Sequence, residues 1–236
     1  MSSTSPNGAQ ALVATLVDAG VDVCFTNPGT SEMHFVAALD DVPAMRGVLG
    51  LFEGVVTGAA DGYARMAGRP AGTLLHLGPG LGNGLANLHN ARRARTPVVN
   101  IVGDHATYHK QYDAPLESDI DAIASAVSGW YRRSTSPADV AADTADAVAA
   151  ALAPPGQVAT LVLPADVCWL PAPGGPATPR AVASTDPVDS DTLATVAALL
   201  REGEPVTLRV GGRPLTRDGT LVAARRAEPT GARLRC

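Results

Sequence analysis

The chain has 236 residues, of which 46% are hydrophobic and 17% charged, and its formal net charge is -5. This length allows one sizeable domain and a remainder. The mildly acidic charge gives no electrostatic reason to expect nucleic acid or an anionic membrane as a partner, and no apolar run reaches the roughly 18 residues that a membrane span needs.

Predicted helices and strands alternate through the first two thirds of the chain. The segment PVVNIVG is apolar almost throughout, as expected for a strand that is covered on both faces of a sheet. The alternation predicts an α/β fold with a parallel sheet and helices on both faces. The expected strands span residues 21–26, 46–52, 71–77, 97–103 and 157–164. The expected helices span residues 7–20, 33–39, 53–68, 85–94, 119–127 and 136–153.

Cap and turn residues set the expected ends of these elements. Asn7 is predicted to cap the first helix and Gly20 to end it. Ser136 is predicted to cap the helix that follows it, with Pro137 in the first turn. The glycine-rich stretch GPGLGNG, residues 78–84, is predicted to form a turn between a strand and a helix.

The C-terminal part of the chain is predicted to be a separate unit. Residues 1–170 are expected to form the first domain and residues 171–187, rich in Pro, Gly and Ala, a linker. Residues 188–236 are expected to begin a second α/β domain, with helices at 189–203 and 218–227 and strands at 205–212 and 232–236. Two helices and one and a half strands cannot close a parallel sheet. We therefore expect the second domain to be truncated and to be the least ordered part of the chain.

The three cysteines point to a cellular compartment. Cys24, Cys168 and Cys236 lie far apart and lack the spacing of a metal site. The opening residues MSSTSPNGAQ have no basic segment followed by an apolar block, so we expect no secretion signal. Together these features predict free thiols, no bound metal and a cytoplasmic protein.

Glu53 is the first candidate for chemistry, because it is the lone acid of GLFEGVVTGAA, the stretch that precedes Asp61, with little around it to pair with. One interpretation is a first-turn glutamate that the helix dipole favours. The other is a carboxyl group in an apolar pocket formed by Leu51, Phe52, Val55 and Val56. There its pKa would be raised, and it could exchange a proton near neutral pH.

Other candidates follow the predicted strands, whose carboxyl ends form the ligand-binding edge of a parallel sheet. His76 ends one strand, and is either a structural residue or part of a site. GPGLGNG could hold a phosphate at a helix N-terminus, but it lacks the GxGxxG pattern and an acidic residue about twenty positions on. His105 and His109 lie four apart with no obvious third ligand, so we do not expect a metal site there.

Three stretches resemble one known family in their order and spacing: NPGTSE, FEGVVTGAADGYAR and HLGPGLGNGLANLHNARRARTPVVNIVGD. They resemble the N-terminal, pyrimidine-binding domain of thiamine diphosphate enzymes of the acetolactate synthase and benzoylformate decarboxylase group. The resemblance covers roughly residues 7–170, and the remainder resembles the start of that family's central domain.

The resemblance implies a role for Glu53, which falls at the glutamate that contacts a ring nitrogen of the cofactor's aminopyrimidine. Proton exchange there would activate the cofactor for attack on the carbonyl of a 2-keto acid. An isolated acid suits this task, because a salt-bridged one would hold its charge too firmly. The other residues implied to line the cofactor cleft are Pro28, Gly29, Gly80 and Asn83.

Two further positions are implied to contact the substrate. His76 falls where benzoylformate decarboxylase-like members use a histidine for proton transfer, and Thr30 where they carry a serine that contacts the substrate carboxylate. One departure from the family pattern follows the strand that ends at Gly103. Asp104 and His105 stand where many members have glutamine, which puts the usual substrate preference in doubt.

The expected function is therefore that of a thiamine diphosphate-dependent 2-keto acid carboligase or decarboxylase, as its cofactor-activating portion. The family holds the diphosphate and its Mg²⁺ in a third domain that nothing in this chain matches, and builds its sites between subunits. The expected partners are a second copy, in a homodimer or homotetramer, or a separate diphosphate-binding chain. The alternative is a non-catalytic fragment that dimerises or binds a partner without turnover. FAD binding would depend on a central domain largely absent here, so the sequence makes no prediction about it.

Overall fold

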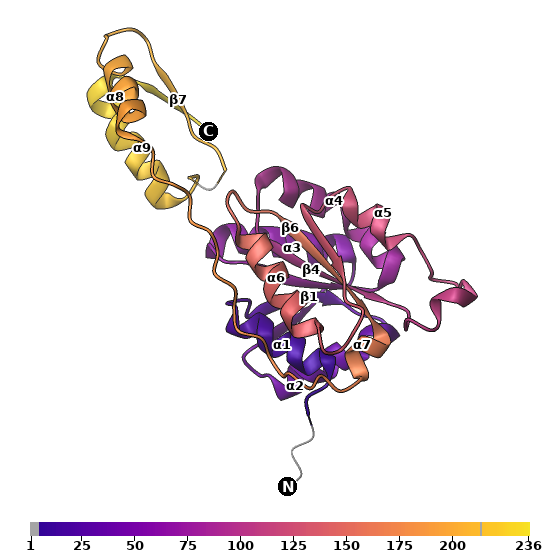
Figure 1. The fold of residues 1–236 in the computed structure, drawn as a ribbon. Helices are drawn as coiled ribbons and strands as arrows, with labels where there is room; N and C mark the ends of the chain where they lie inside the picture. Colours follow the sequence, from indigo (N-terminus) through magenta and orange to yellow (C-terminus); the bar gives the residue numbers. More distant parts are fainter. Residues whose placement is uncertain (1–4, 213) are drawn as a thin grey trace. The chain divides into compact units, whose positions relative to one another are not determined.

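A computed structural model of this chain describes residues 5–212 and 214–236 (Figure 1). The chain divides into two compact units, one that ends at Ala183 and one that runs from Ser184 to Cys236. Within the described residues, none of the helices combines the length and the apolar character needed to cross a membrane.

A six-stranded sheet, parallel throughout, forms the centre of the first unit, in the order β2-β1-β3-β4-β6-β5. This confirms the predicted fold class. One strand, β5, was not expected, because it is short and its residues are only half-buried. The strands are β1 (Val23–Asn27), β2 (Arg46–Leu49), β3 (Ala71–Leu75), β4 (Val98–Asp104), β5 (Trp130–Arg133) and β6 (Val158–Pro164).

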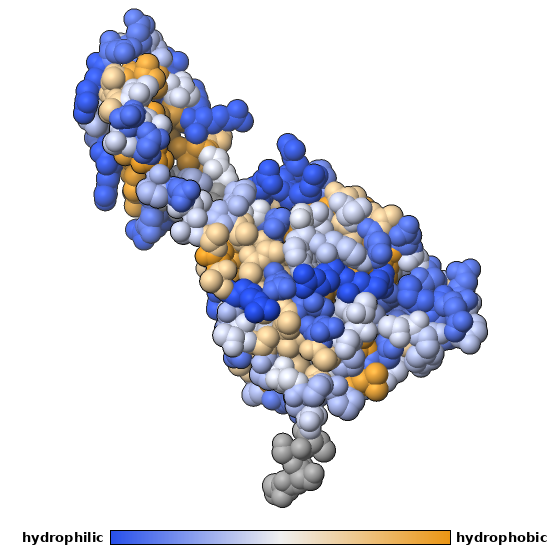
Figure 2. All heavy atoms as spheres, in the orientation of Figure 1, coloured by the Kyte–Doolittle hydropathy of each residue, from blue (hydrophilic) through white to orange (hydrophobic). Residues whose placement is uncertain are grey.

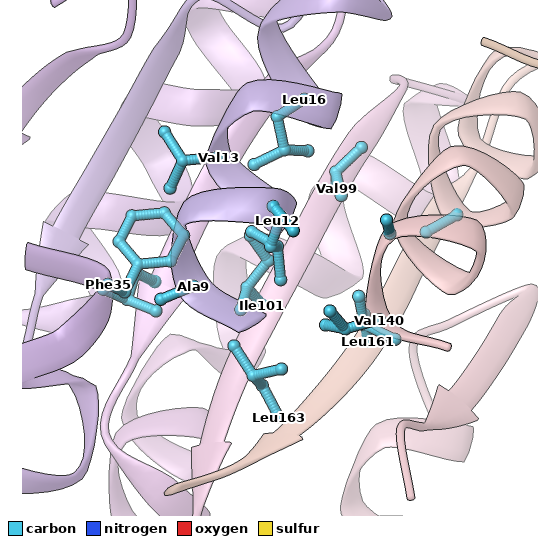
Figure 3. Packing of buried hydrophobic residues seen from close by; sticks show 14 of the residues in the cluster. Ala9, Leu12, Val13, Leu16, Phe35, Val99, Ile101, Val140, Leu161 and Leu163 are labelled. Carbon is cyan, nitrogen blue, oxygen red and sulfur yellow. The ribbon is translucent and has the colours of Figure 1, made fainter. Parts of the chain in front are cut away.

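Helices cover both faces of this sheet, as predicted. One buried cluster joins α1, α2 and α6 to one face (Figure 3), and a second joins α3, α4 and α5 to the other. Neighbouring residues of β4 divide between them, since Ile101 lies in the first cluster and Val102 in the second. The helices are α1 (Gly8–Asp18), α2 (Met33–Asp41), α3 (Glu53–Ala67), α4 (Leu77–Ala94), α5 (Ile120–Ser125), α6 (Val140–Leu152) and α7 (Ala165–Trp169), with 3-10 turns η1 (Thr30–Glu32) and η2 (Lys110–Tyr112).

Some helix ends lie where the sequence predicts them, and others do not. Asn7 caps α1 through a reciprocal capping box with Gln10. Ser136 does not cap α6, which begins at Val140; its hydroxyl accepts from Ala138 N in the preceding turn. The predicted turn at 78–84 is also wrong, because α4 already begins at Leu77 and contains the whole segment.

A chain of buried polar side chains crosses the middle of the sheet. Thr73 Oγ1 on β3 donates to Asn100 Oδ1 on β4 over 2.7 Å. Asn100 Nδ2 donates to Thr160 Oγ1 on β6 over 3.0 Å, and Thr160 also bonds the hydroxyl of Ser128. These bonds satisfy polar groups that would otherwise be unpaired in the core, and they fix the relative register of three strands.

The second unit is small and leaves much apolar surface exposed. It contains α8 (Ser190–Leu199), α9 (Arg217–Thr230) and a two-stranded parallel sheet of β7 (Thr207–Arg209) and β8 (Arg233–Arg235). Among its described residues only Ala227 is buried. Figure 2 shows hydrophobic residues at the surface of this unit. The large apolar side chains that α8 exposes are Leu193, Val196 and Leu199.

Candidate functional site

The candidate residues gather where the strand order of the sheet reverses. β2 lies on one side of β1, whereas β3 and the later strands lie on the other. Ligands of open parallel sheets bind beyond the carboxyl ends of the strands at such a point. Asn27 and Leu75 are partners at the ends of β1 and β3, so Pro28 and His76 directly follow these two strand ends, at the edge where this class of sheet has its ligand crevice.

Glu53 is the first residue of α3, which follows β2 after a short turn. It is buried, with 9% of its surface exposed, and its Oε2 accepts a hydrogen bond from Asn83 Nδ2 over 3.1 Å. No ion pair to Glu53 occurs among the described residues. The carboxylate is therefore held by a neutral amide and is not neutralised by a cation.

Small residues bring α3 and α4 close enough for this contact. The Thr57 hydroxyl bonds Glu53 O and Gly84 O, each over 3.0 Å. A Cβ on Gly84 would lie 2.9 Å from Thr57 Cγ2, too close for a real contact. A Cβ on Gly80 would lie 3.4 Å from Glu53 Oε1 and 3.5 Å from His76 Cβ. Gly80 thus separates Glu53 from His76, and both side chains border the same small space.

The apolar pocket expected around Glu53 is not formed by this chain. Leu51, Phe52 and Val55 are 90%, 50% and 60% exposed, and only Val56 is buried. The reason is their position in the turn and at the start of α3, where one side of the helix packs on the sheet and the other faces outward. The burial of Glu53 comes instead from α4.

His76 lies between β3 and α4 and is held by a residue that the sequence analysis did not select. Its Nδ1 lies 2.7 Å from Oε2 of Glu32, and the same oxygen accepts from Gly29 N over 2.7 Å. The side chain of Glu32 is 1% exposed and that of His76 is 23% exposed. Burial raises the pKa of Glu32, while His76 and the Gly29 N–H act in the opposite direction.

Two glycines make room for this pair. A Cβ on Gly29 would lie 2.3 Å from His76 Nδ1, and a Cβ on Gly103 would lie 1.6 Å from Glu32 Oε1. Glu32 Oε1 is itself buried and has no hydrogen-bond partner among the described residues. Local sequence gives little sign of Glu32, since an acid in TSE resembles an ordinary helix-start residue; only the fold brings it beside the ends of β3 and β4.

The backbone after His76 is strained. Leu77 has φ of 51°, in the left-handed region that a leucine rarely adopts. Its side chain is fully buried, so core packing holds it there. Because Leu77 is also the first residue of α4, the chain passes from β3 to α4 through His76 alone, and the imidazole is fixed at the crevice.

The remaining predicted residues differ in their surroundings. Thr30 begins η1 and is exposed, while Pro28 and Gly29 are half-buried in the same turn. Asn83 is exposed on α4 apart from its bond to Glu53. These positions place a hydroxyl, an amide and open backbone around the crevice.

Asp104, which departs from the family pattern, forms ion pairs with residues of this chain. It is buried and forms ion pairs with Lys110 and with Arg133. The adjacent His105 has a buried Nε2 with no hydrogen-bond partner among the described residues. Burial lowers the pKa of His105, although Glu117 acts in the opposite direction. Asp104 therefore anchors the loop after β4.

The described residues include no group of three His, Cys, Asp or Glu side chains able to hold a metal ion.

Comparison with known proteins gives the family. Residues 6–125 match the family model described as "Thiamine pyrophosphate enzyme, N-terminal TPP binding domain". The chain belongs to this family of thiamine diphosphate enzymes.

Individual relatives agree with this assignment. The chain is 65% identical over 230 residues to a provisionally named acetolactate synthase large subunit, IlvX, of Mycobacterium tuberculosis H37Rv, covering 98% of this chain and 44% of the relative. It is 35% identical over 158 residues to benzoylformate decarboxylase of Pseudomonas aeruginosa, covering 66% of this chain and 29% of that protein. The chain thus spans less than half the length of these relatives.

Solved structures show the same fold. A thiamin diphosphate-dependent enzyme from Mycobacterium smegmatis, itself provisionally assigned, matches with a TM-score of 0.86 and 29% identity, covering 98% of this chain and 44% of that one. The 4-hydroxybenzoylformate decarboxylase of Rhodococcus jostii RHA1 matches with a TM-score of 0.84 and 25% identity, covering 97% and 44%.

Proposed function

We propose that this chain is the cofactor-activating portion of a thiamine diphosphate-dependent 2-keto acid enzyme, an acetolactate synthase-like carboligase or decarboxylase. The observation that carries the proposal is the state of Glu53. It is a buried carboxylate without a cationic partner, held by one amide at the ligand-binding edge of the sheet.

The residues around Glu53 fit a flat nitrogen heterocycle. The carboxylate can accept a proton from a ring nitrogen or return one, and Asn83 holds it in place. Gly80 keeps the neighbouring space free of a side chain. Thiamine diphosphate, when bound, supplies the carbanion and the electron sink that this class of reaction needs.

His76 and Thr30 are proposed to act on the 2-keto acid. The Cβ of His76 lies one glycine away from the Glu53 carboxylate, and the His76 side chain keeps partial exposure, so its imidazole can reach a bound substrate and move a proton. Thr30 offers an exposed hydroxyl from the neighbouring turn to the substrate carboxylate. Pro28 and Gly29 shape the backbone of the same turn.

The diphosphate and Mg²⁺ are proposed to be held outside the described residues, by a domain of another subunit or another polypeptide. The exposed side chains beside Glu53 support association with such a partner. Leu51, Phe52 and Val55 form an apolar surface next to the proposed cofactor site. A homodimer, a homotetramer or a complex with a separate diphosphate-binding chain would bury it, in a cytoplasmic enzyme.

The same surface also favours a second candidate function. A chain that dimerises, or binds a partner through Leu51, Phe52 and Val55, could do so without turnover. Both candidate functions use this apolar surface. They differ in cofactor binding, because only the first expects binding that depends on Glu53.

Calorimetric titration with thiamine diphosphate and Mg²⁺ tests the proposal on the parent chain, Glu53→Gln and a matched control, Glu202→Gln, in the exposed part of the second unit. A hydrogen bond to a charged group contributes about 1.5–3 kcal/mol, so Glu53→Gln should weaken binding at least ~10-fold and the control should not. Equal binding by the parent and Glu53→Gln would refute the assigned role. No binding by any of the three would favour the non-catalytic candidate, and sedimentation of Val55→Ser would then show whether the apolar surface supports self-association.

A further inference from the structure

We propose that Glu32 is a positioning residue that holds His76 in the Nδ1–H tautomer and leaves Nε2 unprotonated at the crevice. The proposal deepens the proposed function, on which it rests only for the reaction that His76 would serve. The arrangement of the two side chains stands on contacts that require no bound cofactor.

The first step concerns the direction of the hydrogen bond. Oε2 of Glu32 accepts the Gly29 N–H over 2.7 Å and also lies 2.7 Å from His76 Nδ1. Whenever Glu32 is ionised, its carboxylate has only acceptors. The imidazole then donates, which places a proton on Nδ1. A free imidazole in water favours the opposite tautomer, so the contact with Glu32 selects the less common form.

The second step concerns the fit of the pair. The imidazole lies against the backbone of Gly29 and the carboxylate against that of Gly103, each in space that a Cβ would occupy. Gly29 precedes η1, His76 directly follows β3, and Gly103 is the next-to-last residue of β4. His76 and Gly103 lie at the same level of the sheet, since Leu75 pairs with Val102. Three neighbouring strand ends thus meet at one carboxylate, which has little freedom to choose another partner.

The third step concerns the atom left for chemistry. No hydrogen bond to His76 Nε2 occurs among the described residues, and the His76 side chain is 23% exposed. A proton taken up at Nε2 would create an imidazolium whose charge is balanced by the carboxylate at Nδ1. The proton can then be returned from the same atom. Because Glu32 touches His76 and not the crevice, it acts through the imidazole alone.

The test is ¹⁵N NMR of the full chain labelled at its five histidines, without cofactor, at about pH 9 where an ordinary imidazole is neutral. The His76 signals are assigned by their loss in His76→Gln. In the parent chain the Nδ1–H form should exceed the Nε2–H form at least ~10-fold, as expected for a hydrogen bond to a charged acceptor. Glu32→Gln should shift the ratio at least ~5-fold toward Nε2–H, because a neutral amide is a weaker acceptor.

The matched control is Glu117→Gln, a change at a second carboxylate, which pairs with Lys110 and not with His76; it should leave the ratio unchanged. A parent chain in which His76 carries its proton on Nε2 overturns the proposal, and this result does not depend on any variant folding. An unchanged ratio in folded Glu32→Gln also overturns it. Since no cofactor is present, either failure is distinct from a failure of thiamine diphosphate to bind.

Discussion

Replacing Gly103 with alanine is expected to disrupt the Glu32–His76 pair, because the new methyl group would collide with the Glu32 carboxylate. The added Cβ would lie 1.6 Å from Glu32 Oε1, whereas real contacts of a Cβ are rarely shorter than 3.0 Å. The carboxylate must therefore move by more than 1 Å. Its bonds to Gly29 N and His76 Nδ1 are both 2.7 Å long, so such a movement breaks them.

The size of the effect follows from these two bonds. Hydrogen bonds to a charged group contribute about 1.5–3 kcal/mol each. Release of a buried carboxylate toward water returns part of that free energy. We expect Gly103→Ala to lower the free energy of unfolding by about 2–3 kcal/mol.

Urea unfolding followed by circular dichroism measures this change, with Gly72→Ala as the control. Gly72 also lies in an inner strand, but a Cβ there would meet its nearest atom at 3.4 Å, which is an ordinary contact. The control should change the unfolding free energy by less than about 1 kcal/mol. If Gly103→Ala were no more destabilising than Gly72→Ala, the carboxylate would not occupy the position described, and the argument for the pair would fail.

Three further results are expected. Asn100→Ala should lower the free energy of unfolding by about 2–4 kcal/mol, measured in urea, because it removes two buried hydrogen bonds and leaves the Thr73 hydroxyl without its acceptor. A loss below about 0.5 kcal/mol, typical of a surface change, would contradict this. Burial raises the pKa of Cys24 and of Cys168 to about 12, so both thiols stay protonated as the pH rises past the ordinary thiol pKa. A thiolate-selective reagent at about pH 8 should therefore modify only the exposed Cys236. Amides of residues 188–236 should exchange with solvent faster than those of β4, since their unit buries little; equal protection would refute this.

Several elements could be predicted because their signal is local. The strand at β4 is a continuous apolar run, and Asn7 has the side chain and the spacing to Gln10 of a capping box. Glu53 stood out as an acid with no nearby partner, and the structure leaves it without an ion pair among the described residues. In each case neighbouring residues alone carry the information.

Other features depend on contacts between distant segments. Glycines at 78–84 suggest a turn by propensity, yet they lie in α4. Two of them, Gly80 and Gly84, lie where a Cβ would meet side chains of α3. β5 is a short edge strand whose arginines pair with acids on other elements. Glu32 acquires its role from His76, 44 positions away in the sequence. None of these pairings leaves a periodic or local pattern.

The abrupt passage from β3 through His76 to the strained Leu77 also has a thermodynamic consequence. With no flexible loop between strand and helix, the imidazole loses its conformational entropy when the chain folds and not when a ligand arrives. A ligand that contacts His76 would therefore require little further ordering of this side chain, and its affinity would depend mainly on the complementarity of the contacts made.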